Sequence, residues 1–376
     1  MMSNLPIYLD FNATTPTATD VLDAMLPWFT TTFGNASSTH LHGQLAASAV
    51  SDARSSLAAA MGVPAAGIVF TSGATEANNL AIRGVSGRVV VASTEHKAVL
   101  DTARTRDHTV VPVDSYGRLD LEALERAAVD ASLISVMLAN NETGLIQDLL
   151  AVVGVGRRHG CLVHTDATQA FGKIPVDFSQ LDVDLVSVSA HKIYGPKGVG
   201  ALYVRRGVRL ETTMTGGGHE RGLRAGTSNV PAIVGFGMAA QRLLPEVEAA
   251  HSRELLDRLV DALAEVQPFD LFSDHHRGLP NTLSIRFPGA DAEAVMANCP
   301  GICISTGSAC TAAIPEPSHV LLAMGVQSTH AFETLRLSVG GPTTAAEIDV
   351  AARSLKRAVM RIRSVTASEL GSQVAG

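Results

Sequence analysis

Short apolar segments alternate with helical stretches through the first part of the chain, and they limit the fold more than any other feature. Most are rich in Val, Ile or Leu, and they are Gly67–Thr71, Arg88–Ser93, Leu133–Ala139, Cys161–Asp166, Asp184–Ser189 and Val199–Val204. Runs of this kind, separated by helices, are typical of a mostly parallel sheet that helices cover on both faces. We therefore predict an α/β fold.

The pattern changes after Pro245. A long helix comes first, because leucines recur on one of its faces, and a strand follows near Asn281–Phe287. A capping box, Thr344 to Glu347, opens the last helix, whose apolar face is Ile348, Ala352, Leu355, Val359 and Ile362. Its basic residues are expected on a solvated face: Lys356, Arg357, Arg361 and Arg363. We expect a large domain over residues 16–250 and a small α+β domain from residues 1–15 and 251–376.

Length and charge exclude several classes of function. A chain of 376 residues can bury a site between two domains. Its net charge of −7, from 29 Lys and Arg against 36 Asp and Glu, offers no basic surface for nucleic acid or anionic membrane. The first ten residues lack the basic and apolar parts of a secretion leader, and no apolar run is long enough to span a bilayer. We expect a cytoplasmic protein.

The cysteines do not form a disulfide framework. The whole chain has four, which are too few and too clustered to stabilise a protein of this size by disulfide bonds. Cys161 lies in an apolar segment and is expected to be an inert buried thiol. Cys299, Cys303 and Cys310 lack the paired spacing of a zinc knuckle, so we expect no metal site.

Polar residues follow the predicted strands one after another. In open α/β sheets, ligands bind beyond the carboxyl ends of the strands, so these residues should meet at one edge. A small-residue turn at 72–79 begins a helix whose free N–H groups suit a phosphate. The other residues at this edge are His96, Asn140, Asn141, Asp166, Gln169 and Lys192.

Each of these residues alone has a structural alternative: a helix cap, a core histidine, a strand-end cap or an ion-paired lysine. Together they match the needs of pyridoxal-5′-phosphate chemistry. A desolvated lysine forms a Schiff base with the cofactor aldehyde, and a carboxylate keeps the pyridine nitrogen protonated. Lys192, at the end of an apolar strand, is the expected lysine, and Asp166 is the expected carboxylate.

The ordered motifs resemble those of the cysteine desulfurases, fold-type I pyridoxal-phosphate enzymes of the class V aminotransferase group, over nearly the whole chain. The motifs are Tyr8-Leu-Asp-Phe-Asn-Ala-Thr-Thr-Pro16, Phe33-Gly-Asn-Ala-Ser-Ser38, Thr71-Ser-Gly-Ala-Thr-Glu76, Thr94-Glu-His-Lys97, Asn140-Asn-Glu-Thr-Gly144, His164-Thr-Asp-Ala-Thr-Gln169, Ser189-Ala-His-Lys-Ile-Tyr-Gly-Pro-Lys197, Arg224-Ala-Gly-Thr227, Gly307-Ser-Ala-Cys310 and Leu335-Arg-Leu-Ser338. The resemblance implies a large domain with a seven-stranded sheet, a smaller α+β domain and a homodimer.

The resemblance also implies a role for each matching residue. Lys192 would carry the cofactor, Asp166 would face the pyridine nitrogen, and Gln169 would approach the phenolic oxygen. His96 would stack on the ring and manage protons. The phosphate would be held by Ala74, Thr75, Ser189 and His191, with Thr227 reaching it from the partner subunit. The substrate L-cysteine would be oriented by Asn12, Asn141 and Arg336, and Cys310 would be the nucleophile that accepts its sulfur.

The sequence departs from the family pattern at two places. Pro315 stands in a loop expected to be free of proline, where it could stiffen the arm that carries Cys310, and Ala36 replaces an expected proline. Three alternatives stay open: a selenocysteine lyase, another class V aminotransferase, and a non-catalytic scaffold that binds partners. A sulfur-acceptor protein is expected, but the sequence does not identify it.

Overall fold

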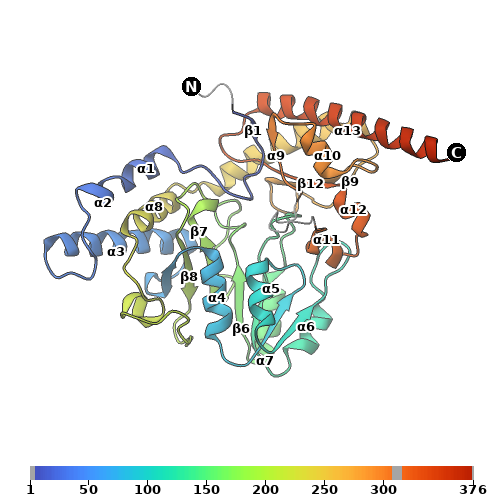
Figure 1. Ribbon diagram of the computed structural model, residues 1–376. Helices are drawn as coiled ribbons and strands as arrows, with labels where there is room; N and C mark the ends of the chain where they lie inside the picture. Colours follow the sequence, from blue (N-terminus) through green and yellow to red (C-terminus); the bar gives the residue numbers. More distant parts are fainter. Residues whose placement is uncertain (1–4, 307–315, 375–376) are drawn as a thin grey trace.

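The computed structural model describes residues 5–306 and 316–374. Its centre is a seven-stranded sheet in the order β2-β8-β7-β6-β5-β3-β4 (Figure 1). The strands are β2 (Ile68–Thr71), β3 (Arg88–Ala92), β4 (His108–Val111), β5 (Ala131–Ser135), β6 (Leu162–Asp166), β7 (Leu185–Ser189) and β8 (Gly200–Val204). Only β8 runs against its two neighbours, and the other pairs are parallel. The predicted α/β fold with a mostly parallel sheet is confirmed.

Helices cover both faces of this sheet because the strand residues alternate between two cores. In β3, Val89 and Val91 pack with α4 (Ala74–Gly84) and α5 (Lys97–Arg104). Val90 and Ala92 face the opposite core, with α3 (Leu41–Met61) and α8 (Val230–Gln241). The same side carries α6 (Leu121–Ala128) and α7 (Leu149–His159), while α1 (Thr19–Met25) and α2 (Pro27–Thr30) lead into α3. Short 3-10 turns lie at Ala65–Gly67, Ala190–Lys192, His219–Gly222 and Ala264–Val266.

Two details of the sheet differ from the sequence prediction. The edge strand β4 was not predicted, because three of its four residues are only partly buried or exposed and its apolar pattern is weak. The segment expected at Leu133–Ala139 forms a strand only to Ser135, and Ala139 makes an isolated antiparallel bridge with Ile146 instead. The chain therefore turns away from the sheet before reaching Asn141.

The C-terminal third builds a second core with the N-terminal segment. An antiparallel sheet of β9 (Asp270–Leu271), β10 (Thr282–Arg286) and β12 (Thr334–Ser338) packs against α9 (Pro245–Leu263) and α13 (Ala345–Val374). Strand β1 (Ile7–Tyr8) pairs with β11 (Ile302–Cys303), which buries Leu9 in this core. The remaining helices are α10 (Ala292–Ala297), α11 (His319–Ala323) and α12 (Ser328–Phe332). The division at residues 15/16 and 250/251 stays a prediction.

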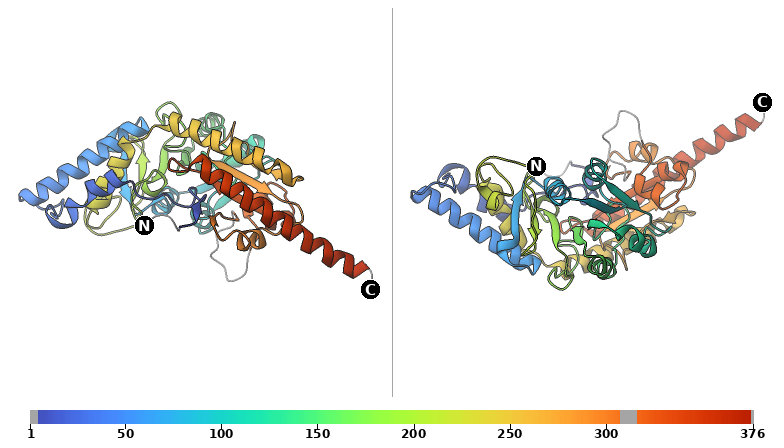
Figure 2. Two further views of the ribbon diagram at one scale, coloured as in Figure 1. Left: turned by 90° about the horizontal axis from the view of Figure 1, so that it is seen from above. Right: turned by 90° about the horizontal axis from the view of Figure 1, so that it is seen from below.

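Helix α13 begins with the predicted capping box: Thr344 N–H donates to Glu347 (2.8 Å), and Glu347 N–H donates to the Thr344 hydroxyl (3.3 Å). The expectation that the basic residues of this helix lie on a solvated face is wrong for Arg363. Its guanidinium donates to the carbonyls of Val266 and Pro288, so it ties α13 to neighbouring loops. Figure 2 shows α3 and α13 at opposite ends of the molecule. Among the described residues, no helix combines the length and apolarity needed to cross a membrane.

Candidate active site

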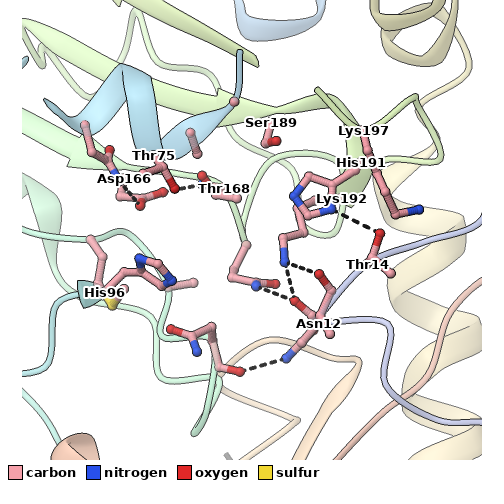
Figure 3. Close-up of a pocket in the computed structure, with 18 of the residues that line it drawn as sticks. Asn12, Thr14, Thr75, His96, Asp166, Thr168, Ser189, His191, Lys192 and Lys197 are labelled. Carbon is pink, nitrogen blue, oxygen red and sulfur yellow. Dashed lines mark hydrogen bonds between the residues drawn. The ribbon is translucent and has the colours of Figure 1, made fainter. Parts of the chain in front are cut away.

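A cavity of about 770 Å³ lies at the carboxyl ends of the parallel strands. Asp166 and Ser189 are the last residues of β6 and β7, and His96 follows β3. The second core contributes Arg336 from β12. The cavity is lined by most of the residues that the sequence singled out: Asn12, Ala74, Thr75, His96, Asn141, Asp166, Gln169, Ser189, His191, Lys192 and Arg336. Figure 3 shows many of them converging on one space.

Lys192 lies in a 3-10 turn that follows β7 directly, so its stem leaves a buried strand and its amine reaches the cavity. The Nζ atom donates to the carbonyls of Asn12 and Ala13, the latter at 2.8 Å (Figure 3). Burial lowers the pKa of Lys192 to about 8, and the positive charge of Arg336 acts in the same direction. A larger fraction of this amine is therefore neutral near pH 8 than for an ordinary lysine.

The turn that carries Lys192 is fixed by Tyr194. This residue has φ of 64°, a left-handed conformation that a bulky side chain rarely adopts. Its N–H donates to the Thr15 hydroxyl (2.9 Å), and its own hydroxyl donates to Glu248 (2.6 Å). These bonds to two other segments compensate the unfavourable backbone and hold the turn in place.

Asp166 is a buried carboxylate with two internal donors. Asn78 Nδ2 donates to one carboxylate oxygen (2.6 Å) and the Thr168 N–H donates to the other (2.9 Å). The neighbouring His164 is neutral, because complete burial lowers its pKa to about 4, and its ring lies between the hydroxyls of Ser135 (2.8 Å) and Ser187 (3.0 Å). Asp166 is thus held as an oriented acceptor at the cavity wall.

One end of the cavity is formed by the N-terminus of α4 and by basic side chains. Residues 73–75 line it, and the first N–H groups of a helix have no partners inside the helix. Gly200 lets this turn lie against β8, since a Cβ there would come within 2.7 Å of the Gly73 backbone. Ser189, His191 and Lys197 also line the cavity. This end is built to receive an anion.

Two histidines at the cavity are held by hydrogen bonds. His96 caps α5, with its Nδ1 accepting from the Ala98 N–H (3.0 Å), so the proton of the neutral ring is on Nε2. His191 bonds the Thr14 hydroxyl through Nδ1 (3.1 Å). Burial lowers the pKa of His191 to about 4, and the nearby charges of Lys192 and Lys197 act in the same direction. Both rings are therefore oriented before any ligand arrives.

Arg336 is the cation of the second core that faces the cavity. It forms an ion pair with Asp10, Nη2 to Oδ1 at 2.7 Å, and its Nη1 donates to the Asn141 carbonyl (3.1 Å). Its buried Nε has no hydrogen-bond partner among the residues that the structure describes. Arg336 lines the cavity, and a guanidinium in such a place can bind a carboxylate through two of its N–H groups.

Sequence reasoning missed several residues that line the cavity or lie behind its wall. Asn78 supports Asp166, and its place in the helix after the Thr71–Glu76 motif was the available signal. Lys173 contacts Gln169 from four residues further along the chain. Glu95 is completely buried, accepts from the Met137 N–H (2.6 Å), and has a pKa raised well above its usual range by burial. Its only signal was its position next to His96.

Two predicted residues among those described do not line this cavity. Thr227 is exposed, and because it was predicted to reach the phosphate of a partner subunit, a single chain does not test that prediction. Asn140 is buried, and its amide donates to the Thr94 carbonyl (3.0 Å) instead. Cys310 lies outside the described residues, as does Pro315. One group of described side chains, Asp257, His275 and His276, is close enough to hold a metal ion, but none of them lines the cavity. In this group, the Nε2 atoms of both histidines lie close to the same carboxylate oxygen of Asp257, at 2.8 Å for His275 and 3.1 Å for His276.

Comparison with known proteins gives a consistent result. Residues 7–350 match the family model described as aminotransferase class-V. The chain is 41% identical over 381 residues to cysteine desulfurase IscS of Rickettsia bellii, covering 96% of this chain and 93% of the relative.

Two solved structures are similar over most of the chain. A NifS-like protein matches with a TM-score of 0.88 and 35% identity over 94% of this chain and 99% of its own. A structure described as SspA in complex with cysteine matches with a TM-score of 0.81 and 35% identity over 89% and 99%. The chain therefore belongs to the class-V aminotransferase family, among the cysteine desulfurases.

Proposed function

We propose that this enzyme converts L-cysteine to L-alanine with pyridoxal-5′-phosphate and transfers the sulfur to Cys310. The observation that carries the proposal is the amine of Lys192, with its pKa lowered to about 8, in a cavity that also holds Asp166 and Arg336. The choice of substrate is supported by the cysteine desulfurase relatives and by the similar structure of SspA, which is in complex with cysteine.

The residues present fit the cofactor. The anion-receiving end at α4, Ser189 and His191 suits its phosphate, and the Asp166 carboxylate suits its protonated pyridine nitrogen. Thr168 Oγ1 is buried beside this carboxylate with no partner in the described part of the chain, as expected of a surface that receives a ligand. Lys192 Nζ would bind the aldehyde carbon of the cofactor. When bound, the group supplies an electron sink for bonds to the substrate Cα and Cβ.

The chain supplies orientation and proton transfer. Arg336 would bind the substrate carboxylate through its guanidinium, with Asn141 and Asn12 fixing its position. Lys192 Nζ, once neutral and free, would remove the proton from Cα. His96 would exchange a proton through Nε2, because its Nδ1 is occupied by the Ala98 N–H.

Cys310 would then complete the reaction. Its thiolate attacks the sulfur of the substrate, an S–S bond forms, and the Cβ–S bond breaks with its electron pair left on carbon. After protonation at carbon, the products are L-alanine and a persulfide on Cys310. An acceptor thiol of unidentified origin must take this sulfur before the next turnover.

We also propose that the enzyme is a homodimer in the cytoplasm. The α1–α3 end of the molecule exposes large apolar side chains, including Leu26 (52%), Phe29 (59%) and Phe33 (68%). Such a patch is typical of a surface that another chain covers. A reactive thiol also requires a reducing compartment. Light scattering on the purified protein measures the predicted dimer mass.

The direct test is to incubate purified enzyme with L-cysteine and a reductant and to quantify alanine and sulfide together. Equal yields, many per enzyme, are expected. Cys310→Ser should still bind L-cysteine and change the cofactor spectrum but form no persulfide. A fully active serine variant would contradict the assignment of Cys310 as the nucleophile. Turnover that requires an added keto acid and does not require the thiol would favour an aminotransferase. A purified protein that takes up no cofactor would favour the scaffold alternative.

A further inference from the structure

Lys173 is a completely enclosed lysine behind the wall of the cavity. Its side chain is only 4% exposed, and it does not line the cavity itself. The Nζ atom donates to two amide oxygens, Oδ1 of Asn12 at 2.8 Å and Oε1 of Gln169 at 2.5 Å. Lysine is rarely buried unless its amine has partners, so these two contacts explain how it is accommodated there.

The contact with Gln169 fixes which end of its amide faces the cavity. Because Oε1 accepts from Lys173, Nε2 is directed to the backbone carbonyl of Asn12, at 2.9 Å. The same carbonyl accepts from Lys192 Nζ. The amide N–H of Gln169 and the amine of Lys192 therefore meet at one oxygen, with Lys173 behind them.

The contact with Asn12 fixes a second amide in the same way. Its Oδ1 accepts from Lys173 and from Asn281 Nδ2 (3.1 Å), so its Nδ2 is turned toward the Asn141 carbonyl (3.1 Å) and the Thr282 hydroxyl (2.8 Å). This network joins the second core to the cavity wall. Lys173 joins it from the turn that follows β6.

A neutral apolar side chain could not do this. Without a donor at this position, Oε1 of Gln169 would lose its partner, and of these two contacts only the bond from Nε2 to the Asn12 carbonyl would still hold the amide. Flipping the amide would place Oε1 beside the Asn12 carbonyl, where two acceptors face each other. Burial and the charge of Lys192 both lower the pKa of Lys173 well below its usual range, but the amine donates hydrogen bonds in either protonation state.

We propose that Lys173 is a positioning residue of the cofactor site, which acts by holding the N–H of Gln169 toward the position where Lys192 carries its ligand. The inference rests on the proposed function, because the ligand group that this N–H meets is an oxygen acceptor, for which the phenolic oxygen of the cofactor is suited. Lys173 itself touches neither cofactor nor substrate.

The test is a double-mutant cycle with Lys173→Met, Gln169→Met and the double variant. The dissociation constant for pyridoxal-5′-phosphate is measured by titrating cofactor-free protein, and the pH midpoint of the visible cofactor band is recorded. Lys173→Met should bind about tenfold more weakly than wild type, as expected for one lost hydrogen bond. Its pH midpoint should move toward that of Gln169→Met. In the Gln169→Met background, the Lys173 change should add little.

Equal fold losses in both backgrounds, or an unchanged pH midpoint in Lys173→Met, would overturn the inference and leave Lys173 with a packing role. Thermal melting of the cofactor-free proteins checks folding, and Lys173→Gln, which keeps a donor, replaces Met where Met does not fold and should retain more affinity. Failure of wild type to bind the cofactor would contradict the proposed function instead, so the two failures are distinguishable.

Discussion

Asp10 and Arg336 form an ion pair across the boundary between the N-terminal segment and β12, with 2.7 Å between Asp10 Oδ1 and Arg336 Nη2. The side chain of Arg336 is only 8% exposed and that of Asp10 is 20% exposed, so the pair is largely shielded from water. Asp10 occupies one terminal nitrogen, and no described residue bonds Nε. The pair therefore sets the angle at which the guanidinium meets the cavity.

Asp10→Asn should weaken this orientation, because a neutral amide accepts a weaker hydrogen bond than a carboxylate. We expect kcat/KM for L-cysteine to fall about tenfold, mainly through a higher KM, since a charge-assisted bond is worth about 1.5–3 kcal/mol. Steady-state kinetics measure the effect. A lower KM would show that Asp10 competes with the substrate carboxylate for Arg336 rather than positioning it.

The lowered pKa of Lys192 predicts how cofactor capture depends on pH. Only the neutral amine attacks an aldehyde, and in this protein it becomes the major form above pH 8. The capture rate of cofactor-free protein should therefore rise about tenfold per pH unit below this value and level off above it. Stopped-flow absorbance from pH 6 to 10 measures this curve.

Arg336→Met provides the matched control for this curve. The positive charge of Arg336 lowers the pKa of Lys192, so its removal should move the midpoint of capture to higher pH. A wild-type midpoint above pH 10, as for an exposed lysine, would contradict the desolvation that the structure indicates.

Gly200→Ala should disrupt the anion-receiving end of the cavity. The added Cβ would lie 2.7 Å from the backbone of both Gly73 and Val188, and neither backbone atom can move as a side chain does. We expect a loss of about 1–3 kcal/mol in the free energy of unfolding, together with weaker cofactor binding. Gly301→Ala is the control, because nothing lies within 4 Å of its Cβ. Urea denaturation of both variants checks the difference, and equal stability would contradict the tight packing.

Much of the cavity could be predicted because parallel strands bring their carboxyl ends together. Asp166 ends β6 and Lys192 comes just after β7, the neighbouring parallel strand, so the sheet alone brings the two residues close together. Arg336 is different: it comes from another core, more than a hundred residues away, and only the family resemblance pointed to it.

The role of Lys173 could not be predicted from the residue type, because lysines are usually exposed. The residues next to it in the sequence also give no sign that its amine will bond the side-chain amides of Asn12 and Gln169. The edge strand β4 was missed for the opposite reason. Its hydrogen bonds with β3 make it a strand. Its own residues lack the continuous apolar character that marks a buried strand in a sequence.

Because His164 is buried, we expect the free energy of unfolding to decrease in mild acid. Burial lowers its pKa from 6.5 to about 4 in the folded protein, so between these values the unfolded chain binds a proton that the folded chain does not. Stability therefore falls as pH falls through this window, and His164 should account for about 2 kcal/mol between pH 7 and pH 5. His164→Asn keeps a donor and an acceptor between Ser135 and Ser187 but does not titrate. Urea denaturation of the two proteins should show a steeper decline for wild type, and parallel declines would mean that His164 titrates normally.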